Sequence, residues 1–207
     1  MLRVGLTGGL ASGKSFVGQA LKDLGCHLIQ ADELGHEVLM PGAEAYEAAV
    51  REFGAGVLAE DGTIDRSRLA AEVFDKPERL AKLNSLVHPP VIRREEEILK
   101  DLERRDPGGI VVMEAAILIE TGSYTRFDQI IVVVATPAQQ VERAMGRGLS
   151  REEALARIGR QMPLEEKRKY ADYVIDTSGR KEDTLRQAGE VYRALAGTAA
   201  PGGSVSQ

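Results

Sequence analysis

An eight-residue stretch near the start of the chain constrains its fold more than any other feature. Residues 8–15 read GGLASGKS and satisfy the pattern G-x-x-x-x-G-K-S. In this pattern a glycine-rich turn points backbone N–H groups inward at phosphate oxygens, and the N-terminus of the following helix adds its dipole. An ordinary glycine turn is the alternative. The apolar residues 2–7 before the stretch and the helical spacing of residues 16–24 after it favour a phosphate-binding loop.

Two side chains of this loop have predicted chemical roles. Lys14 is expected to reach the β and γ phosphates of a bound nucleotide, and the hydroxyl of Ser15 is expected to ligate Mg²⁺. The other residues that we assign to the nucleotide cradle are Gly8, Gly9, Ala11, Ser12, Gly13 and Phe16.

The apolar pattern predicts an α/β fold. Strands are expected at residues 2–7, 26–31, 110–116, 129–135 and 173–176, and they are rich in Val and Ile, as strands buried on both faces are. Helical spacing between these strands predicts a three-layer αβα core around a parallel sheet of about five strands. Together with the phosphate-binding loop, this predicts a P-loop NTPase.

Long segments between the strands predict additions to this core. Helical spacing recurs at residues 46–53, 66–74, 78–86 and 91–104, which is too much chain for a simple crossover. We therefore expect an inserted helical subdomain for the second substrate and a helical lid. The predicted division is a nucleotide-binding core at 1–31, 107–136 and 171–196, an acceptor subdomain at 32–106, a lid at 137–170 and a disordered tail at 197–207.

The predicted lid is the basic part of an acidic protein. Arg143 and Arg147 are one helical turn apart, and Arg157 and Gln161 repeat that spacing. Phosphoryl transfer depends on positioning and charge neutralisation, so arginines on a closing segment suit a kinase. A solvated basic helix face is the alternative for any one of them.

Asp32 is expected at the carboxyl end of the second strand, the edge at which open parallel sheets bind ligands. There it can take a proton from an attacking hydroxyl, or it can cap a helix that begins at Glu33, and the two roles are compatible. Residues 32–35, DELG, also fit the D-x-x-G pattern of GTP switches. They follow Lys14 by only 18 residues, however, and the chain has no N-K-x-D.

Other candidates carry weaker signals. His88 precedes Pro89 and Pro90, a pattern typical of a helix end with an incidental imidazole. Glu114 and Glu120 are weak candidates for holding Mg²⁺ or the acceptor. The three histidines have no metal-ligand spacing, which argues against a histidine metal site.

Composition excludes several classes of protein. A net charge of −5 argues against a dedicated nucleic-acid-binding protein, and the single Cys26 cannot form an internal disulfide. The longest apolar runs, 110–119 and 130–135, are shorter than the roughly 18 residues of a membrane helix, and the N-terminus does not resemble a signal peptide. We expect a cytoplasmic protein, a monomer or small homo-oligomer, without nucleic-acid or membrane partners.

Taken together, these stretches resemble the dephospho-coenzyme A kinase family. The resemblance spans nearly the whole chain and runs, in the family's order, through GLTGGLASGKS, ADELGHEV, PGAEAY, DGTIDRSRLAAEVF, LNSLVHP, AILIETG, ERAMGR, ARIGRQMP and KRKYADYVIDTSG. It implies phosphorylation of the ribose 3′-hydroxyl of dephospho-coenzyme A (dephospho-CoA), with ATP as co-substrate and Mg²⁺ as cofactor. A kinase for another small metabolite, such as a nucleoside monophosphate, is the alternative, and a nucleotide-dependent switch is a more distant one.

The resemblance also implies roles for single residues. Asp32 resembles the family's catalytic base, and Lys14 and Ser15 resemble its phosphate and magnesium residues. Arg143 and Arg147 resemble its lid arginines, and His88, Arg157 and Gln161 are expected at the substrate. The chain departs from the family's usual pattern at Phe16, Gln30, His36, the stretch Ala116-Ile117-Leu118, and Thr177, which stands near the expected adenine site.

Overall fold

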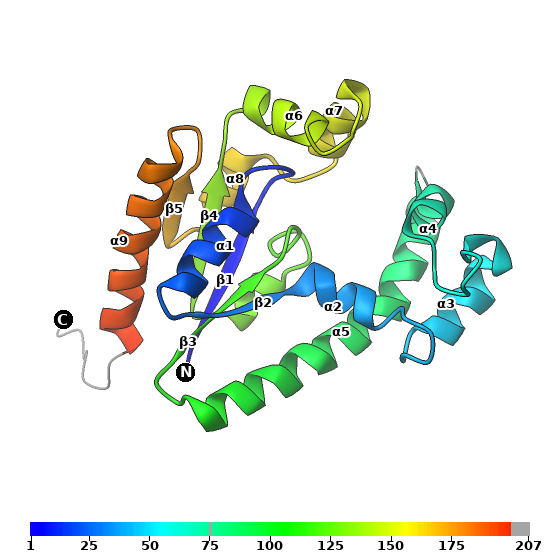
Figure 1. Ribbon diagram of the computed structural model, residues 1–207, viewed down its shortest axis with the longest axis horizontal. Coiled ribbons are helices and arrows are strands. Elements are labelled where there is room, and N and C mark those ends of the chain that lie inside the picture. Colours follow the sequence, from blue (N-terminus) through cyan, green and yellow to red (C-terminus); the bar gives the residue numbers. More distant parts are fainter. Residues whose placement is uncertain (75, 200–207) are drawn as a thin grey trace. The chain divides into compact units, whose positions relative to one another are not determined.

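Five parallel strands form a single sheet in the order β2-β3-β1-β4-β5 in the computed structural model, which describes residues 1–74 and 76–199 (Figure 1). The strands are β1 (Leu2–Gly8), β2 (His27–Gln30), β3 (Ile110–Glu114), β4 (Gln129–Val134) and β5 (Tyr173–Asp176). The predicted α/β class and parallel sheet are therefore confirmed. In this register Gln30 of β2 lies beside Glu114 of β3, and Gly8 of β1 lies beside Val133 of β4.

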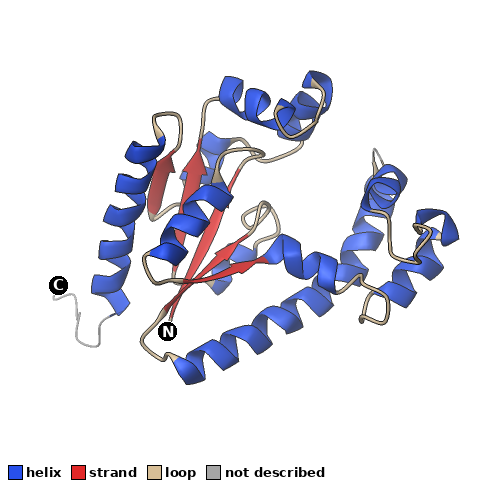
Figure 2. Cartoon of the chain, viewed as in Figure 1, coloured by secondary structure: helices blue, strands red, loops and turns tan. Residues whose placement is uncertain are grey.

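Two helices cover one face of the sheet. They are α1 (Lys14–Asp23) and α9 (Lys181–Ala199), which lie next to each other across the strands (Figure 2). Every second residue of a strand points to this face, so Val4, Leu6 and Val133 pack against the helices. The helices contribute Val17, Leu21, Ala188, Val191 and Leu195 to the same core.

The alternate strand residues face the opposite layer. Ile130, Val132 and Val134 of β4 pack against Leu118 and Ile119 of the segment that follows β3. This segment includes the short 3₁₀ helix η2 (Ser123–Arg126), and α8 (Leu164–Arg168) adds Leu164 to the cluster. The sheet is thus buried on both faces, as its Val and Ile content predicted.

The helical insertion forms a compact unit of its own, residues 31–101. It contains α2 (Ala31–Glu37), α3 (Tyr46–Phe53), η1 (Ala55–Val57), α4 (Arg66–Val73) and most of α5 (Pro77–Arg105). Its core is the buried cluster of Ala49, Phe53, Val57 and Leu69. The remaining described residues, 1–30 and 102–199, form the sheet unit. That unit includes α6 (Pro137–Met145) and α7 (Arg151–Gly159) of the predicted lid, so an independent lid stays a prediction.

Three expectations about helix bounds are wrong. The expected helices at 78–86 and 91–104 are one helix, α5, which continues through Pro89 and Pro90. Each proline removes one i→i−4 hydrogen bond, but the long flanking turns remain and the ring of Pro90 is buried, so packing outweighs the local preference. Helix α2 begins at Ala31, which puts Asp32 inside its first turn instead of at the N-cap. Helix α9 extends through Ala199 into the predicted tail, and residues 200–207 lie outside the described residues.

In the part of the chain that the structure describes, no helix has the length and apolar character to cross a membrane. The location of the protein and its state of assembly stay predictions.

Candidate functional site

The backbone of residues 8–15 forms an anion cradle between β1 and α1. Gly13 precedes α1 with φ of 93°, and Ala11 has φ of 53°, a left-handed conformation that residues with side chains seldom adopt. The N–H groups of Ala11, Gly13, Ser15 and Phe16 donate no hydrogen bond to any described residue. A run of unsatisfied N–H groups at a helix N-terminus is the arrangement that binds phosphate.

Two glycines of the loop lie where a Cβ would come within 3 Å of a neighbouring atom. A Cβ on Gly8 would lie 2.4 Å from the carbonyl oxygen of Val133, which is backbone and cannot move aside. A Cβ on Gly9 would lie 2.5 Å from Nε2 of Gln140 on α6. The Oγ of Ser12 is buried and has no hydrogen-bond partner among the described residues, so the loop holds one unsatisfied polar side chain as well.

Lys14 lies across the mouth of the cradle. Its Nζ donates to the carbonyl oxygens of Gly9 at 3.0 Å and Gly8 at 3.4 Å. The ammonium group is therefore held by carbonyl oxygens of the loop itself, where a charged phosphate oxygen can replace them as its acceptor.

Ser15 and Glu114 bring two oxygen ligands together beside the cradle. The Ser15 hydroxyl donates to Oε1 of Glu114 at 2.8 Å, and Nε2 of Gln30 donates to the other carboxylate oxygen at 3.4 Å. Glu114 is only 8% exposed. Hydroxyl and carboxylate oxygens are the ligands that Mg²⁺ prefers. Within the described residues no group of three or more acidic, His or Cys side chains is arranged to hold a metal.

Arg143 of α6 is fixed at the rim of the loop by Thr177. Its guanidinium donates to the Thr177 hydroxyl at 2.9 Å and to the Thr177 carbonyl oxygen at 2.6 Å. The same hydroxyl donates to the carbonyl oxygen of Ser12 at 2.7 Å. The sequence singled out Thr177 only as a departure from the family's pattern, whereas in the structure it links Arg143 of α6 to the loop.

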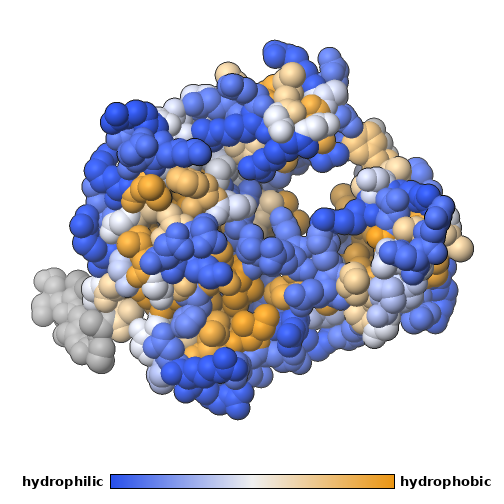
Figure 3. Space-filling model, in the orientation of Figure 1, coloured by the Kyte–Doolittle hydropathy of each residue, from blue (hydrophilic) through white to orange (hydrophobic). Residues whose placement is uncertain are grey.

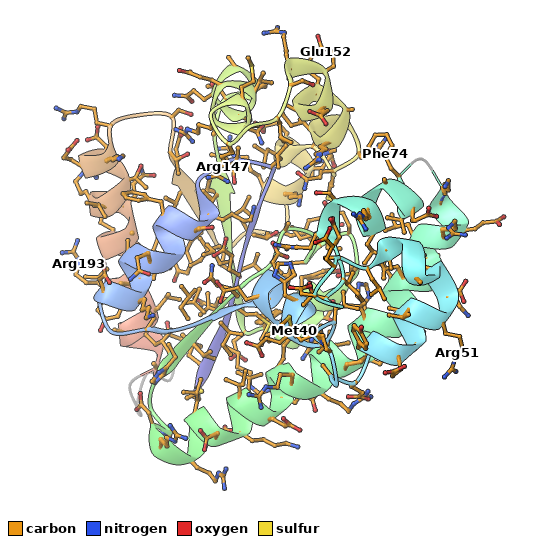
Figure 4. The ribbon with its side chains drawn as sticks, turned by 45° about the vertical axis from the view of Figure 1, so that its right-hand side comes forward. Met40, Arg51, Phe74, Arg147, Glu152 and Arg193 are labelled. Atoms are coloured by element: carbon orange, nitrogen blue, oxygen red, sulfur yellow. The ribbon has the colours of Figure 1, made fainter. Side chains whose placement is uncertain are left out.

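The other arginines of the predicted lid are exposed. Arg147 lies just beyond the end of α6 (Figure 4), and its side chain forms no hydrogen bond or ion pair with the described residues. Arg157 is exposed on α7 and interacts electrostatically with Glu153. Figure 3 shows hydrophobic residues among hydrophilic ones over α6 and α7. Met145 of α6 and Leu155 of α7 are about half exposed.

Gln161 follows α7 and contacts the loop directly. Its Oε1 accepts a hydrogen bond from the N–H of Leu10 at 2.7 Å. Gln140, which the sequence did not single out, donates to the carbonyl oxygen of the same residue at 2.7 Å. The pattern of residues 8–15 carries no signal for either contact, because both partners are more than a hundred residues away.

Two predicted residues belong to the helical unit. Asp32 is exposed in the first turn of α2, where its carboxylate interacts electrostatically with His36. His88 is half-buried in the middle of α5 and does not mark a helix end.

The helical unit also contains an apolar groove of about 370 Å³. Its lining residues are His36, Leu39, Met40, Ile64, Arg66, Leu69, Ala70, Val73 and Leu83. Met40 is 52% exposed and is labelled in Figure 4. Burial, and then the Arg66 guanidinium, hold the pKa of His36 below its usual range, against the opposing effect of Asp32 and Glu33. The groove therefore combines apolar walls with the fixed positive charge of Arg66.

Comparison with known proteins identifies the family that this chain resembles. The family model for dephospho-CoA kinase matches residues 2–183. The dephospho-CoA kinase of Aquifex aeolicus is 43% identical over 195 residues, which is 94% of this chain and 98% of that protein.

Two solved structures have the same fold over nearly the whole chain. The crystal structure of TT1252 from Thermus thermophilus has a TM-score of 0.83 and 37% identity, and it covers 94% of this chain and 97% of its own. The dephospho-CoA kinase from Campylobacter jejuni has a TM-score of 0.70 and 26% identity, with coverage of 96% and 98%.

Proposed function

The chain belongs to the dephospho-CoA kinase family, and we propose that it transfers the γ-phosphoryl group of ATP to the ribose 3′-hydroxyl of dephospho-CoA at the loop of residues 8–15. This reaction is the last step of coenzyme A synthesis. The observation that carries the proposal is the cradle itself: unsatisfied N–H groups at the start of α1, with Lys14 across them and Ser15 at their end.

Lys14 supplies positive charge to the transferring group. Its ammonium leaves the carbonyl oxygens of Gly8 and Gly9 for oxygens of the β and γ phosphates, where it stabilises the charge that moves onto the leaving ADP. The backbone N–H groups act in the same way without having to reorient, because the loop is already folded. The exposed Arg147 is free to add a second cation from the α6 side.

Ser15 and Glu114 are the residues that would hold Mg²⁺. The ion, when bound, neutralises phosphate charge and orients the γ-phosphoryl group. The carboxylate of Glu114 has to exchange its hydrogen bond from Ser15 for this role, and Gln30 continues to orient it through the other oxygen.

Asp32 is the proposed general base. Its carboxylate takes the proton of the 3′-hydroxyl while that oxygen forms its bond to phosphorus and the bond from phosphorus to ADP breaks. The support is its position in the first turn of α2, directly after β2, together with its match to the base of the family.

The apolar groove of the helical unit is proposed to take the pantetheine arm of dephospho-CoA. Leu39, Leu69 and Leu83 supply apolar wall for the arm. Arg66 supplies a cation for the diphosphate to which the arm is attached. An acceptor without the arm, such as a nucleoside monophosphate, gains no binding free energy from this groove.

A direct test is the release of ADP with two acceptors. The wild-type protein should release ADP from ATP with dephospho-CoA and far more slowly with AMP, and ³¹P NMR of the product should show a 3′-phosphomonoester. Lys14→Met serves as the inactive control for contaminating kinases. Equal turnover of AMP would favour a nucleoside monophosphate kinase, and tight GTP binding without acceptor-dependent turnover would favour a switch.

A further inference from the structure

The backbone of Leu10, at the tip of the phosphate-binding loop, is held from two sides by glutamine side chains. Nε2 of Gln140 donates to its carbonyl oxygen at 2.7 Å, and Oε1 of Gln161 accepts from its N–H at 2.7 Å. The backbone partners fix the orientation of both amides, because a carbonyl needs a donor and an N–H needs an acceptor. One glutamine acts only as a donor here, and the other acts only as an acceptor.

The side chain of Gln140 is tightly enclosed. The residue is 3% exposed, and its amide packs against the bare Cα of Gly9. The side chain of Leu10 and the buried Ala11 pack into the cluster that joins α6 to α7, with Val141, Ala144 and Ala154. The tip of the loop is thus fixed through both its backbone and its side chains.

The residue after Gln161 is held by a further contact. The N–H of the next residue, Met162, donates to Oε1 of Glu120 at 3.2 Å. The same carboxylate oxygen pairs at 2.8 Å with Lys167, whose side chain is fully buried and also donates to the carbonyl oxygen of Ala116. The acceptor for Leu10 therefore sits on a chain segment that is tied to the sheet unit.

These contacts affect the cradle through Ala11. Its left-handed φ of 53° is unfavourable for a residue with a side chain, so something must hold the preceding peptide unit in place. The Gln161 contact also uses the N–H of Leu10, and the unsatisfied N–H groups that remain for phosphate are those of Ala11, Gly13, Ser15 and Phe16. Without the two glutamines the loop could relax at Ala11 and turn that N–H away from the phosphates.

We propose that Gln140 and Gln161 are positioning residues for ATP: together they hold the Leu10 backbone so that the N–H groups after it face the phosphates before nucleotide arrives. This inference rests on the proposed function only in naming ATP as the ligand. It assigns to Gln161 a task at the loop instead of at the acceptor, and it gives Gln140 a task that the sequence did not suggest.

The opposite polarity of the two contacts provides the experiment. Gln161→Glu keeps an acceptor for the N–H of Leu10, whereas Gln161→Leu removes it. Gln140→Glu places a carboxylate against a carbonyl oxygen, and Gln140→Leu removes the donor. The readouts are the Kd of a non-hydrolysable ATP analogue, the KM values for ATP and dephospho-CoA, and the Tm, each at low and high salt. High salt separates the repulsion that an added carboxylate exerts on the triphosphate from the loss of a hydrogen bond, because it screens only the former.

The proposal expects a specific pattern. Gln140→Leu, Gln140→Glu and Gln161→Leu should each raise the Kd and the KM for ATP about tenfold, the effect of roughly 1.4 kcal/mol, with the KM for dephospho-CoA little changed. Gln161→Glu should approach wild-type affinity at high salt. Gln139→Leu is the matched control, because Gln139 is the neighbour of Gln140 on α6 but donates to the Ser178 carbonyl oxygen instead of Leu10. It should lower Tm without changing the Kd.

Other results would overturn the proposal. One is an equal loss of ATP affinity in Gln161→Glu and Gln161→Leu at high salt. Another is wild-type ATP affinity in Gln140→Glu. A third is a fall in the Tm of the Gln140 and Gln161 variants with no change in their Kd for the ATP analogue. If Gln140→Leu does not fold, the pair at the less buried Gln161 still decides the question. Failure of the proposed function is a separate outcome, since the Kd pattern does not require turnover of dephospho-CoA.

Discussion

Gly9→Ala should damage the loop through a side chain 131 residues away. Gly9 does not have a positive φ, so alanine meets no backbone strain there. The new Cβ would lie 2.5 Å from Nε2 of Gln140, where ordinary contact begins near 3.5 Å, and the amide must therefore move by about 1 Å. A shift of that size away from the loop breaks its 2.7 Å hydrogen bond to the Leu10 carbonyl oxygen.

The size of the effect follows from the loss of that one buried contact. A carbonyl and an amide left without partners cost about 1–3 kcal/mol. The Kd for ATP rises about tenfold if the free loop relaxes, so that about 1.4 kcal/mol of this cost falls on the ATP-bound state alone. Urea unfolding measures the first quantity, and titration with a non-hydrolysable ATP analogue measures the second.

A double-mutant cycle identifies the cause. In a Gln140→Ala background the nearest remaining neighbour of the alanine at position 9 is Leu164 Cδ2 at an ordinary 3.4 Å, so Gly9→Ala should then have almost no further effect. Gly8→Ala is the matched control, because its Cβ meets the carbonyl oxygen of Val133, and no side-chain truncation relieves that clash. If Gly9→Ala is as harmful in the Gln140→Ala background as in the wild type, the steric reasoning is refuted.

Four further perturbations test other parts of the site. Asp32→Asn should lower kcat by about 10²–10⁴ with unchanged ATP affinity, and pre-steady-state phosphoryl transfer at near wild-type rate would remove Asp32 from the role of base. Glu114→Gln should raise the Mg²⁺ concentration for half-maximal rate about tenfold, measured at fixed ATP, because a neutral amide is a weaker ligand than a carboxylate. Ala70→Phe, which fills the apolar groove, should raise the KM for dephospho-CoA and not that for ATP, and equal changes in both would argue against an acceptor groove. The pKa of His36 is lowered in the folded protein, so the unfolded chain binds this proton more readily. The free energy of unfolding should therefore fall as the pH drops through about 6.5. His36→Gln should reduce this pH dependence, measured by urea unfolding at a series of pH values.

Local patterns predicted those parts of the structure that depend on near neighbours. The expected strand at 173–176 and helix at 46–53 have the bounds found in the structure, because period and flanking residues define them. The helix through Pro89 and Pro90 could not be predicted in this way. Proline is an unfavourable residue in a helix, and only the packing of the folded helical unit reverses that preference.

The same distinction between local and long-range contacts applies to the site. The pattern of residues 8–15 predicts the cradle, since a phosphate-binding turn is built from its own backbone. Glu114 was only a weak candidate, because a single acidic residue at a strand end has many uses; the register that puts β3 beside β2 brings Gln30 and Glu114 together. The role of Thr177 as the link between Arg143 and Ser12 depends on contacts across more than thirty and more than a hundred residues.

Gly9 shows why a sequence pattern and its physical cause can differ. The pattern G-x-x-x-x-G-K-S does not require glycine at its second position, so the sequence alone gives no reason for Gly9. The structure supplies one, because a buried amide from α6 occupies the space that a side chain would fill. Gly9 and Gln140 therefore act as a pair, and tolerance of a side chain at position 9 should depend on which residue occupies position 140. In a library of small residues at 9, Ala or Ser should weaken ATP binding relative to Gly when Gln is at 140, and should leave it nearly unchanged relative to Gly when Ala is at 140.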